Sequence, residues 1–185
     1  VSATTLDAAP AKIAAAMDRR VQKGKISQVD RDAALKRIKV SSNLADVGKC
    51  DMVIEAATEK ESIKNAIFAD LAPHLAPHTI LTSNTSSISI TRLASRTDRP
   101  EKFMGFHFMN PVPVMALVEL IRGIATDEDT FKQVRELTVR LGKQPANSED
   151  FPAFIVNRIL LAMMNAAIYT LYEGVGTVES IDTAM

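Results

Sequence analysis

His107 is the residue whose surroundings most clearly suggest acid–base chemistry. It stands in an apolar, strand-like run at residues 103–108, and a second such run at residues 115–121 contains Glu119. A carboxylate inside a buried strand is unfavourable unless a partner compensates its charge, and His107 is the candidate partner. A carboxylate beside an imidazole fixes the tautomer of the ring and favours its protonated form, which suits a general base near neutral pH. The alternative is a purely structural His–Glu pair in a sheet.

A second polar cluster, Glu-Ala-Ala-Thr-Glu at residues 55–59, follows a compact apolar run at residues 51–56. Small side chains here allow a flat ligand to approach the backbone, and Glu59 or Lys64 could contact a ribose or a phosphate. In open α/β sheets, ligands bind beyond the carboxyl ends of the strands, where this cluster is expected to lie. The alternative is an ordinary acidic helix N-terminus with a lysine on the surface.

A third cluster, Ser-Asn-Thr-Ser-Ser at residues 83–87, follows the strand-like residues 79–83. Its hydroxyl, amide and N–H groups could bind an amide or a carbonyl oxygen, and the alternative is a helix cap. Asn157 stands in the first turn of a long apolar helix expected at residues 152–173. It could reach the same crevice, or it could form a capping or inter-domain hydrogen bond.

The first expected helix ends at Gly24, and basic side chains gather at this end: Arg19, Arg20, Lys23 and Lys25. Cations are favoured at this end of a helix because they complement its dipole, so a solvated helix end is one interpretation. The functional interpretation is a clamp for a phosphorylated ligand.

The elements that would position these groups alternate between strands and helices. The pattern further predicts helices ending at Gly24 and at residue 37, helices at 58–71, 88–94 and 127–141, a last helix capped by Thr177, and strands at 38–40 and 143–148. Thr126 is expected to cap the helix at 127–141, and Pro145 fits a strand only at a sheet edge. The alternation favours an α/β fold with a mostly parallel sheet. We place a domain boundary near Glu149, separating residues 1–149 from residues 150–185.

The composition narrows the class of protein. Of 185 residues, 46% are hydrophobic and 24% charged, which is ordinary for a globular core, and basic and acidic residues balance at 22 each. This balance argues against nucleic acid or a membrane surface as a partner. The single cysteine, Cys50, excludes an internal disulfide and suits a reducing compartment, for which we expect the cytoplasm. His74 and His78 flank Pro77, but we find no further ligands for zinc and predict no metal site.

Several motifs in combination carry a specific resemblance. They are DMVIEAATE, SNTSSISIT, FHFMNPVPVM, LVELIRG, FIVNR and YEGVGTVESIDTAM. With them the chain resembles the L-3-hydroxyacyl-CoA dehydrogenase family, in particular its stand-alone bacterial 3-hydroxybutyryl-CoA members. The resemblance implies a Rossmann-like, mostly parallel sheet followed by the start of a helical C-terminal domain. It also implies NAD as cofactor, an acyl-CoA substrate, oxidation of the substrate's 3-hydroxyl group or the reverse reduction, and a homodimer.

The resemblance assigns roles to individual residues. His107 corresponds to the base that takes the hydroxyl proton, and Glu119 to the carboxylate that orients it. Ser86 and Asn157 correspond to the remaining catalytic residues, which also hold the substrate. The implied cofactor contacts are Glu59, Lys64, Asn84, Ser86 and Asn110. Lys23 corresponds more loosely to a contact with a CoA phosphate, which would explain the basic helix end.

The chain also departs from the family pattern. The family opens with a strand, a G-x-G-x-x-G turn and a helix, and this fingerprint has no counterpart in the sequence. We therefore expect a sheet truncated at its N-terminal side, weak NAD binding and impaired turnover by this polypeptide. Ala116 stands where the family usually has Lys, and Ala153 where many members have Gly. Two rival interpretations are a non-catalytic, crystallin-like NAD-binding relative and a β-hydroxyacid dehydrogenase that acts without CoA.

Overall fold

The computed structural model describes residues 3–185, so the first two residues of the predicted domain 1–149 lie outside the described residues. The chain divides into two compact units, one up to Gly48 and the other Lys49–Met185. The domain boundary expected near Glu149 falls inside the second unit and stays a prediction.

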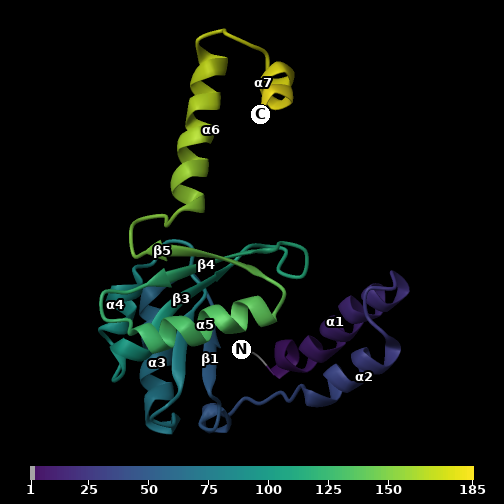
Figure 1. Ribbon diagram of the computed structural model, residues 1–185, viewed down its shortest axis with the longest axis vertical. Coiled ribbons are helices and arrows are strands. Elements are labelled where there is room, and N and C mark those ends of the chain that lie inside the picture. The colour runs from purple at the N-terminus through teal and green to yellow at the C-terminus, as the bar shows by residue number, and fades with distance from the viewer. Residues whose placement is uncertain (1–2) are drawn as a thin grey trace. The chain divides into compact units, whose positions relative to one another are not determined.

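The first unit is a helical pair. Helix α1, Ala3–Gln22, and helix α2, Gln28–Arg37, lie side by side (Figure 1). Arg31 of α2 donates from Nε to Oδ1 of Asp18 of α1 at 2.8 Å. Gly24 ends α1, as predicted, because its φ of +63° reverses the chain at little steric cost.

The strand expected at residues 38–40 is wrong. These residues are exposed, and although Ile38 is extended, no strand among the described residues pairs with them. Their apolar side chains fit the pattern of a strand, but a strand is stable only with a hydrogen-bonded neighbour. A short 3₁₀ turn, Leu44–Val47, closes the first unit.

The second unit is built on one five-stranded sheet (Figure 1). Its strands follow chain order across the sheet: β1 Met52–Glu55, β2 Ile80–Ser83, β3 Phe103–Phe108, β4 Leu117–Arg122 and β5 Gln144–Glu149. All neighbours run parallel except β3 and β4, which are antiparallel. The predicted mostly parallel α/β fold is therefore confirmed. Pro145 lies in the edge strand β5, where its missing N–H is tolerated.

Helices cover both faces of this sheet. They are α3 Glu61–Leu71, α4 Ile90–Ala94 and α5 Glu128–Arg140, with 3₁₀ turns at Ala72–His74 and Pro100–Lys102. Phe106 of β3 and Leu120 of β4 face α5 and pack in one buried cluster with Phe131 and Val134. Phe103 faces the other side and meets Phe68 of α3 edge to face, with 5.0 Å between the ring centroids. Successive strand residues thus serve opposite layers.

The close packing of β3 against its neighbours explains Gly105. A Cβ atom at this position would lie 2.8 Å from Cβ of Ile121 and 2.9 Å from Cδ1 of Ile90. Any larger residue would push β3 away from β4 and α4. Because Gly105 lies two residues before His107 on the same face, this packing helps to fix the strand that carries the imidazole.

Several predicted helix starts need correction. Helix α3 begins at Glu61 and not at residue 58, and α4 begins at Ile90 and not at residue 88, where Ser89 caps it. Asp127, and not Thr126, caps α5: its Oδ1 accepts from the N–H of Thr130 at 2.6 Å. The Thr126 hydroxyl instead donates to the carbonyl of Phe103 at 2.6 Å. The long apolar helix α6 spans Val156–Tyr172 and does not begin at residue 152, because Ala153 and Phe154 have positive φ values of 66° and 50°.

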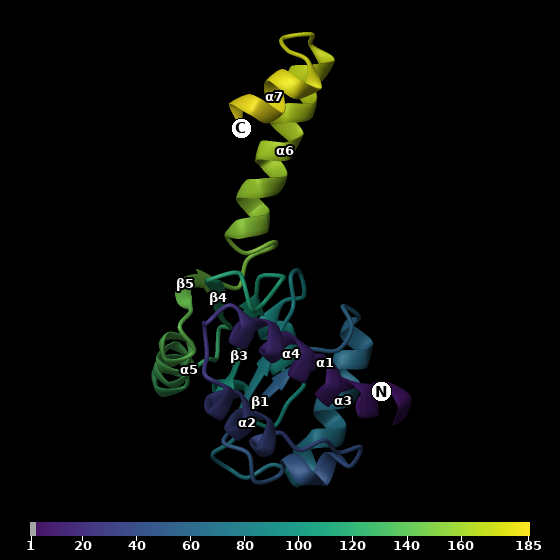
Figure 2. The same cartoon turned by 90° about the vertical axis from the view of Figure 1, so that its right-hand side faces the viewer.

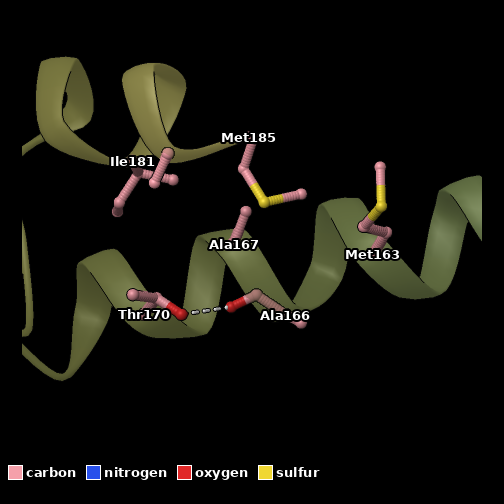
Figure 3. A pocket seen from close by; sticks show the side chains of 7 residues that line it. Met163, Ala166, Ala167, Thr170, Ile181 and Met185 are labelled. Atoms are coloured by element: carbon pink, nitrogen blue, oxygen red, sulfur yellow. Dashed lines mark hydrogen bonds between the residues drawn. The ribbon is translucent and has the colours of Figure 1, made fainter.

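The C-terminal part of the second unit is helical. Helix α6 is followed by α7, Val178–Ala184, which Thr177 caps as predicted by accepting from the N–H of Ser180. The two helices lie side by side (Figure 2) and line an open, apolar pocket of about 230 Å³ (Figure 3). No residue of α6 is buried. Within residues 3–185, none of the helices combines the length and apolarity needed to cross a bilayer.

Candidate active site

His107 and Glu119 are cross-strand partners at the centre of the site. They stand opposite each other in the antiparallel register of β3 and β4. His107 Nδ1 lies 2.8 Å from Oε2 of Glu119, and the two residues are 6% and 0% exposed. Directly opposed residues in a sheet share one face, so the register itself brings the two groups together. The pairing expected from the sequence is therefore present.

Glu119 has a second set of partners that the sequence did not indicate. Its Oε1 accepts hydrogen bonds from the backbone N–H groups of Ile155 at 3.0 Å and Val156 at 2.8 Å. These amides open α6, whose N-terminus has no side-chain cap of its own. The carboxylate therefore lies where the helix dipole favours negative charge.

These contacts determine the tautomer of His107. An ionised carboxylate only accepts hydrogen bonds, so Nδ1 of the neutral ring carries the proton and donates it to Glu119. The lone pair is then on Nε2, which lies 3.0 Å from the hydroxyl oxygen of Ser86. Ser86 is exposed, whereas Glu119 is fully buried. A chain of hydrogen bonds thus leads from the protein interior to the surface.

Glu59 holds the turn that carries Ser86. Its Oε1 accepts from the hydroxyl of Thr85 at 2.6 Å and from the N–H groups of Ser86 at 2.9 Å and Ser87 at 3.1 Å. Burial alone would raise the pKa of Glu59, but hydrogen bonds from Thr85, Ser86 and Ser87 lower it below its ordinary value. Glu59 therefore positions the hydroxyl that meets His107, a role the sequence did not indicate. Its contact with a cofactor stays a prediction.

Lys64 is buried, so the alternative of an ordinary surface lysine is wrong. It is 0% exposed, and its Nζ donates to Oε2 of Glu55 at 2.6 Å and to the carbonyl of Asn84 at 3.2 Å. Glu55 also accepts from the hydroxyl of Ser83 at 2.6 Å. A buried lysine needs such a partner because an unpaired charge is very costly inside a protein. Its contact with a ribose or a phosphate stays a prediction.

Asn84 connects this ion pair to the strand of the imidazole. Its N–H donates to the carbonyl of Glu55 at 2.7 Å, and its Oδ1 accepts from the N–H of Phe108 at 2.9 Å. Phe108 directly follows His107, so Asn84 fixes the end of β3 beside the catalytic candidate. In this structure its side-chain oxygen faces the protein, and a cofactor contact of Asn84 stays a prediction.

The remaining predicted residues occupy three different places. Asn157 lies half-buried in the first turn of α6. It directly follows Val156, whose backbone N–H donates to Oε1 of Glu119. Asn110 is exposed at the end of β3, three residues after His107. Lys23 is exposed just beyond α1, in the first unit, whereas all the others belong to the second.

Asp150 is a positioning residue that sequence reasoning missed. It accepts from the hydroxyl of Ser89 at 2.7 Å and from the N–H groups of Ile90 at 3.0 Å and Thr91 at 2.8 Å. Burial alone would raise the pKa of Asp150, but these hydrogen bonds lower it below its ordinary value. The contacts tie the segment before α6 to the start of α4. An acid directly after an edge strand and two residues before a proline was the available signal.

The described residues fit one end of a dinucleotide. Ala56 and Ala57, exposed beyond β1, leave the backbone accessible to a flat ring, and exposed Ser86 lies beyond β2 next to His107. This is the edge of a parallel sheet at which such ligands bind. A nicotinamide ring and a hydroxylated substrate could meet beside Nε2 of His107. The sequence offers no glycine-rich turn for the pyrophosphate.

Comparisons with known proteins match nearly the whole chain to one family. The family model described as "3-hydroxyacyl-CoA dehydrogenase, NAD binding domain" matches residues 1–151. The family model described as "3-hydroxyacyl-CoA dehydrogenase, C-terminal domain" matches residues 154–185. A 3-hydroxybutyryl-CoA dehydrogenase of Bradyrhizobium diazoefficiens is 58% identical over 100% of this chain and 63% of its own. A 3-hydroxyadipyl-CoA dehydrogenase of Escherichia coli is 42% identical over 100% of this chain and 39% of its own.

Comparison with solved structures leads to the same family. The crystal structure of (S)-3-hydroxybutyryl-CoA dehydrogenase PaaH1 from Ralstonia eutropha has a TM-score of 0.93 and 44% identity, over 97% of this chain and 64% of that one. A mostly parallel sheet with flanking helices, together with the NAD-binding match, defines a Rossmann-like dinucleotide-binding fold. The chain belongs to the 3-hydroxyacyl-CoA dehydrogenase family. It spans less than two thirds of the length of the relatives named above.

Proposed function

We propose that the protein carrying this chain oxidises (S)-3-hydroxyacyl-CoA, with 3-hydroxybutyryl-CoA as substrate, to 3-oxoacyl-CoA, or catalyses the reverse reduction. The choice of 3-hydroxybutyryl-CoA as substrate is supported by the similar proteins that are named 3-hydroxybutyryl-CoA dehydrogenase. The observation that carries the proposal is the hydrogen-bonded chain from Glu119 through His107 to Ser86. It holds a lone pair of an imidazole next to an exposed hydroxyl.

His107 acts as the general base in the oxidation. Nε2 takes the proton from the 3-hydroxyl group of the substrate while the C3–H bond breaks and a C3=O double bond forms. NAD, when bound, supplies the acceptor for the hydride that leaves C3. In the reduction, protonated His107 returns the proton to the carbonyl oxygen. Glu119 keeps Nδ1–H directed towards itself throughout.

Ser86 and Asn157 hold the substrate in this proposal. The hydroxyl of Ser86, 3.0 Å from Nε2, is placed to donate to the same substrate oxygen that His107 serves. Asn157 follows the two amides that Glu119 fixes, so one carboxylate sets the position of both the imidazole and the start of α6. The amide of Asn157 would bind the thioester part of the substrate.

The binding roles outside this centre belong to the same proposal. Glu59, Lys64, Asn84 and Asn110 surround the cofactor end of the site, and Lys23 serves a phosphate of CoA. We also propose that the protein is cytoplasmic and that it forms a homodimer.

A reduction assay with acetoacetyl-CoA and NADH tests the proposal. His107→Gln keeps the size and polarity of the site but removes the base, so we expect kcat to fall by about 100- to 10,000-fold. His78→Gln is the matched control, because His78 is exposed and its Nε2 contacts only Oδ1 of Asp51, at 3.3 Å on the surface, among the described polar contacts. Equal rates for the two variants would refute the role of His107.

The same assay separates the two rival functions. No reduction by the wild-type protein, with NAD binding retained, would favour a non-catalytic relative of the crystallin type. Equal turnover of acetoacetate and acetoacetyl-CoA would favour a dehydrogenase that acts without CoA.

A further inference from the structure

We propose that Lys143 is a positioning residue that holds the loop between β3 and β4, residues 109–116, in place beside His107. The consequence for catalysis rests on the proposed function, but the effect on the loop does not.

The loop has little support of its own. Residues 110–116 are all exposed. Inside the loop, the N–H groups of Val114 and Met115 donate to the carbonyl of Pro111 at 2.9 and 3.0 Å. Pro111 and Pro113 have no N–H to donate, so the loop cannot form a regular hydrogen-bonded structure.

Lys143 supplies the missing support from outside. Its Nζ donates to the carbonyl of Met115 at 2.7 Å and also to the carbonyl of Val112. The two acceptors lie on either side of the turn, so one ammonium group fastens both halves of it. Hydrogen bonds from a charged donor are roughly twice as strong as neutral ones.

The backbone of Lys143 is itself firmly placed. Gly142, with a φ of +71°, ends α5, and the N–H of Lys143 donates to the carbonyl of Thr138 at 3.1 Å. The next residue, Gln144, opens β5 and donates to the carbonyl of Ala116 at 2.9 Å. The lysine therefore stands on a rigid junction of a helix and a strand, as a clamp requires.

The loop matters to the site because of what it carries. It begins two residues after His107 and contains Asn110, the proposed cofactor contact. Val112 and Val114 expose apolar side chains on it. A loosened loop would spread Asn110 over many positions, whereas His107 would remain paired with Glu119 inside the sheet. Loss of Lys143 should thus weaken ligand binding and spare the chemical step.

Hydrogen exchange tests the clamp without any assay of activity. We compare Lys143→Met with Lys132→Met, which removes the same charge from an exposed position on α5. The amides of Val114 and Met115 should exchange roughly 10-fold faster in Lys143→Met than in wild type. In Lys132→Met their exchange rates should equal those of wild type. Equal exchange in the two variants would overturn the proposal, whatever the protein catalyses.

Kinetics test the consequence for binding. In Lys143→Met the KM for NADH should rise roughly 3- to 10-fold, with kcat within about twofold and the pH profile unchanged. Lys143→Arg should restore most of the KM, because a guanidinium group can also donate to both carbonyls. A fall in kcat at unchanged KM, or no rescue by arginine, would overturn the positioning role. An inactive wild type would refute the proposed function but leave the exchange result standing.

Discussion

The replacement Glu119→Gln tests the tautomer argument in depth. Glutamine has nearly the same shape, but one of its two terminal atoms donates hydrogen bonds instead of accepting them. The amides of Ile155 and Val156 both donate to Oε1, so the glutamine oxygen must remain there. Its NH₂ group then faces Nδ1 of His107 across the present 2.8 Å contact. Two donors cannot share this contact, so Nδ1 must become the acceptor.

This change places the proton of the neutral ring on Nε2, where it blocks the base. The corresponding Asp→Asn change in a Ser-His-Asp triad lowers kcat by about 10⁴ through the wrong tautomer. We expect a loss of about 10³- to 10⁴-fold here. All three hydrogen bonds persist in the variant, but they no longer involve a charged group and are roughly half as strong, so the free energy of unfolding should also fall by about 1–2 kcal/mol.

Two measurements examine this expectation. The first is kcat for acetoacetyl-CoA reduction, and the second is the nitrogen NMR spectrum of His107, which distinguishes the two tautomers even in an inactive protein. Activity within about tenfold of wild type, or a proton that stays on Nδ1 in the variant, would refute the reasoning.

Three further predictions concern stability. Lys64→Met should lower the free energy of unfolding by about 3–5 kcal/mol, because it leaves Glu55 as an unpaired buried charge; urea denaturation should show partial recovery in a variant with both residues replaced by Met. Ala153→Gly should raise stability by about 0.5–1 kcal/mol, seen as a higher Tm, because the φ of 66° strains any residue with a Cβ; a lower Tm would contradict this. The pKa of Asp150 is lower in the folded than in the unfolded protein, so its contribution is present above the unfolded value and is lost as pH falls through the folded one. Acid unfolding of Asp150→Asn should therefore depend less on pH below about 4 than that of wild type, and parallel curves would argue against the role of Asp150.

The sequence predicted the central pair because strand periodicity is a strong local signal. Two apolar runs joined by a short connection favour an antiparallel pair of strands. Each run contains a single ionisable residue, so these two residues are expected to form a hydrogen bond with each other. The mostly parallel sheet was predictable for the same reason, since short links between alternating elements allow few topologies.

The missed features depend on tertiary contacts. Lys64 has no local signal of burial, because a lysine one turn into a helix is normally solvated, and only the fold brings Glu55 and Asn84 around it. The start of α6 was predicted too early, because nothing in its composition reveals that Glu119 caps it at Ile155. The positive φ at Ala153 is likewise invisible in a residue that usually favours helices.

The crucial measurement is a crystal structure of the protein with NAD and acetoacetyl-CoA. We predict that the 3-oxo oxygen lies within about 2.6–3.2 Å of His107 Nε2, with Nδ1 still paired with Glu119. A substrate whose 3-oxo oxygen meets another group, with Nε2 turned away from it, would contradict the account.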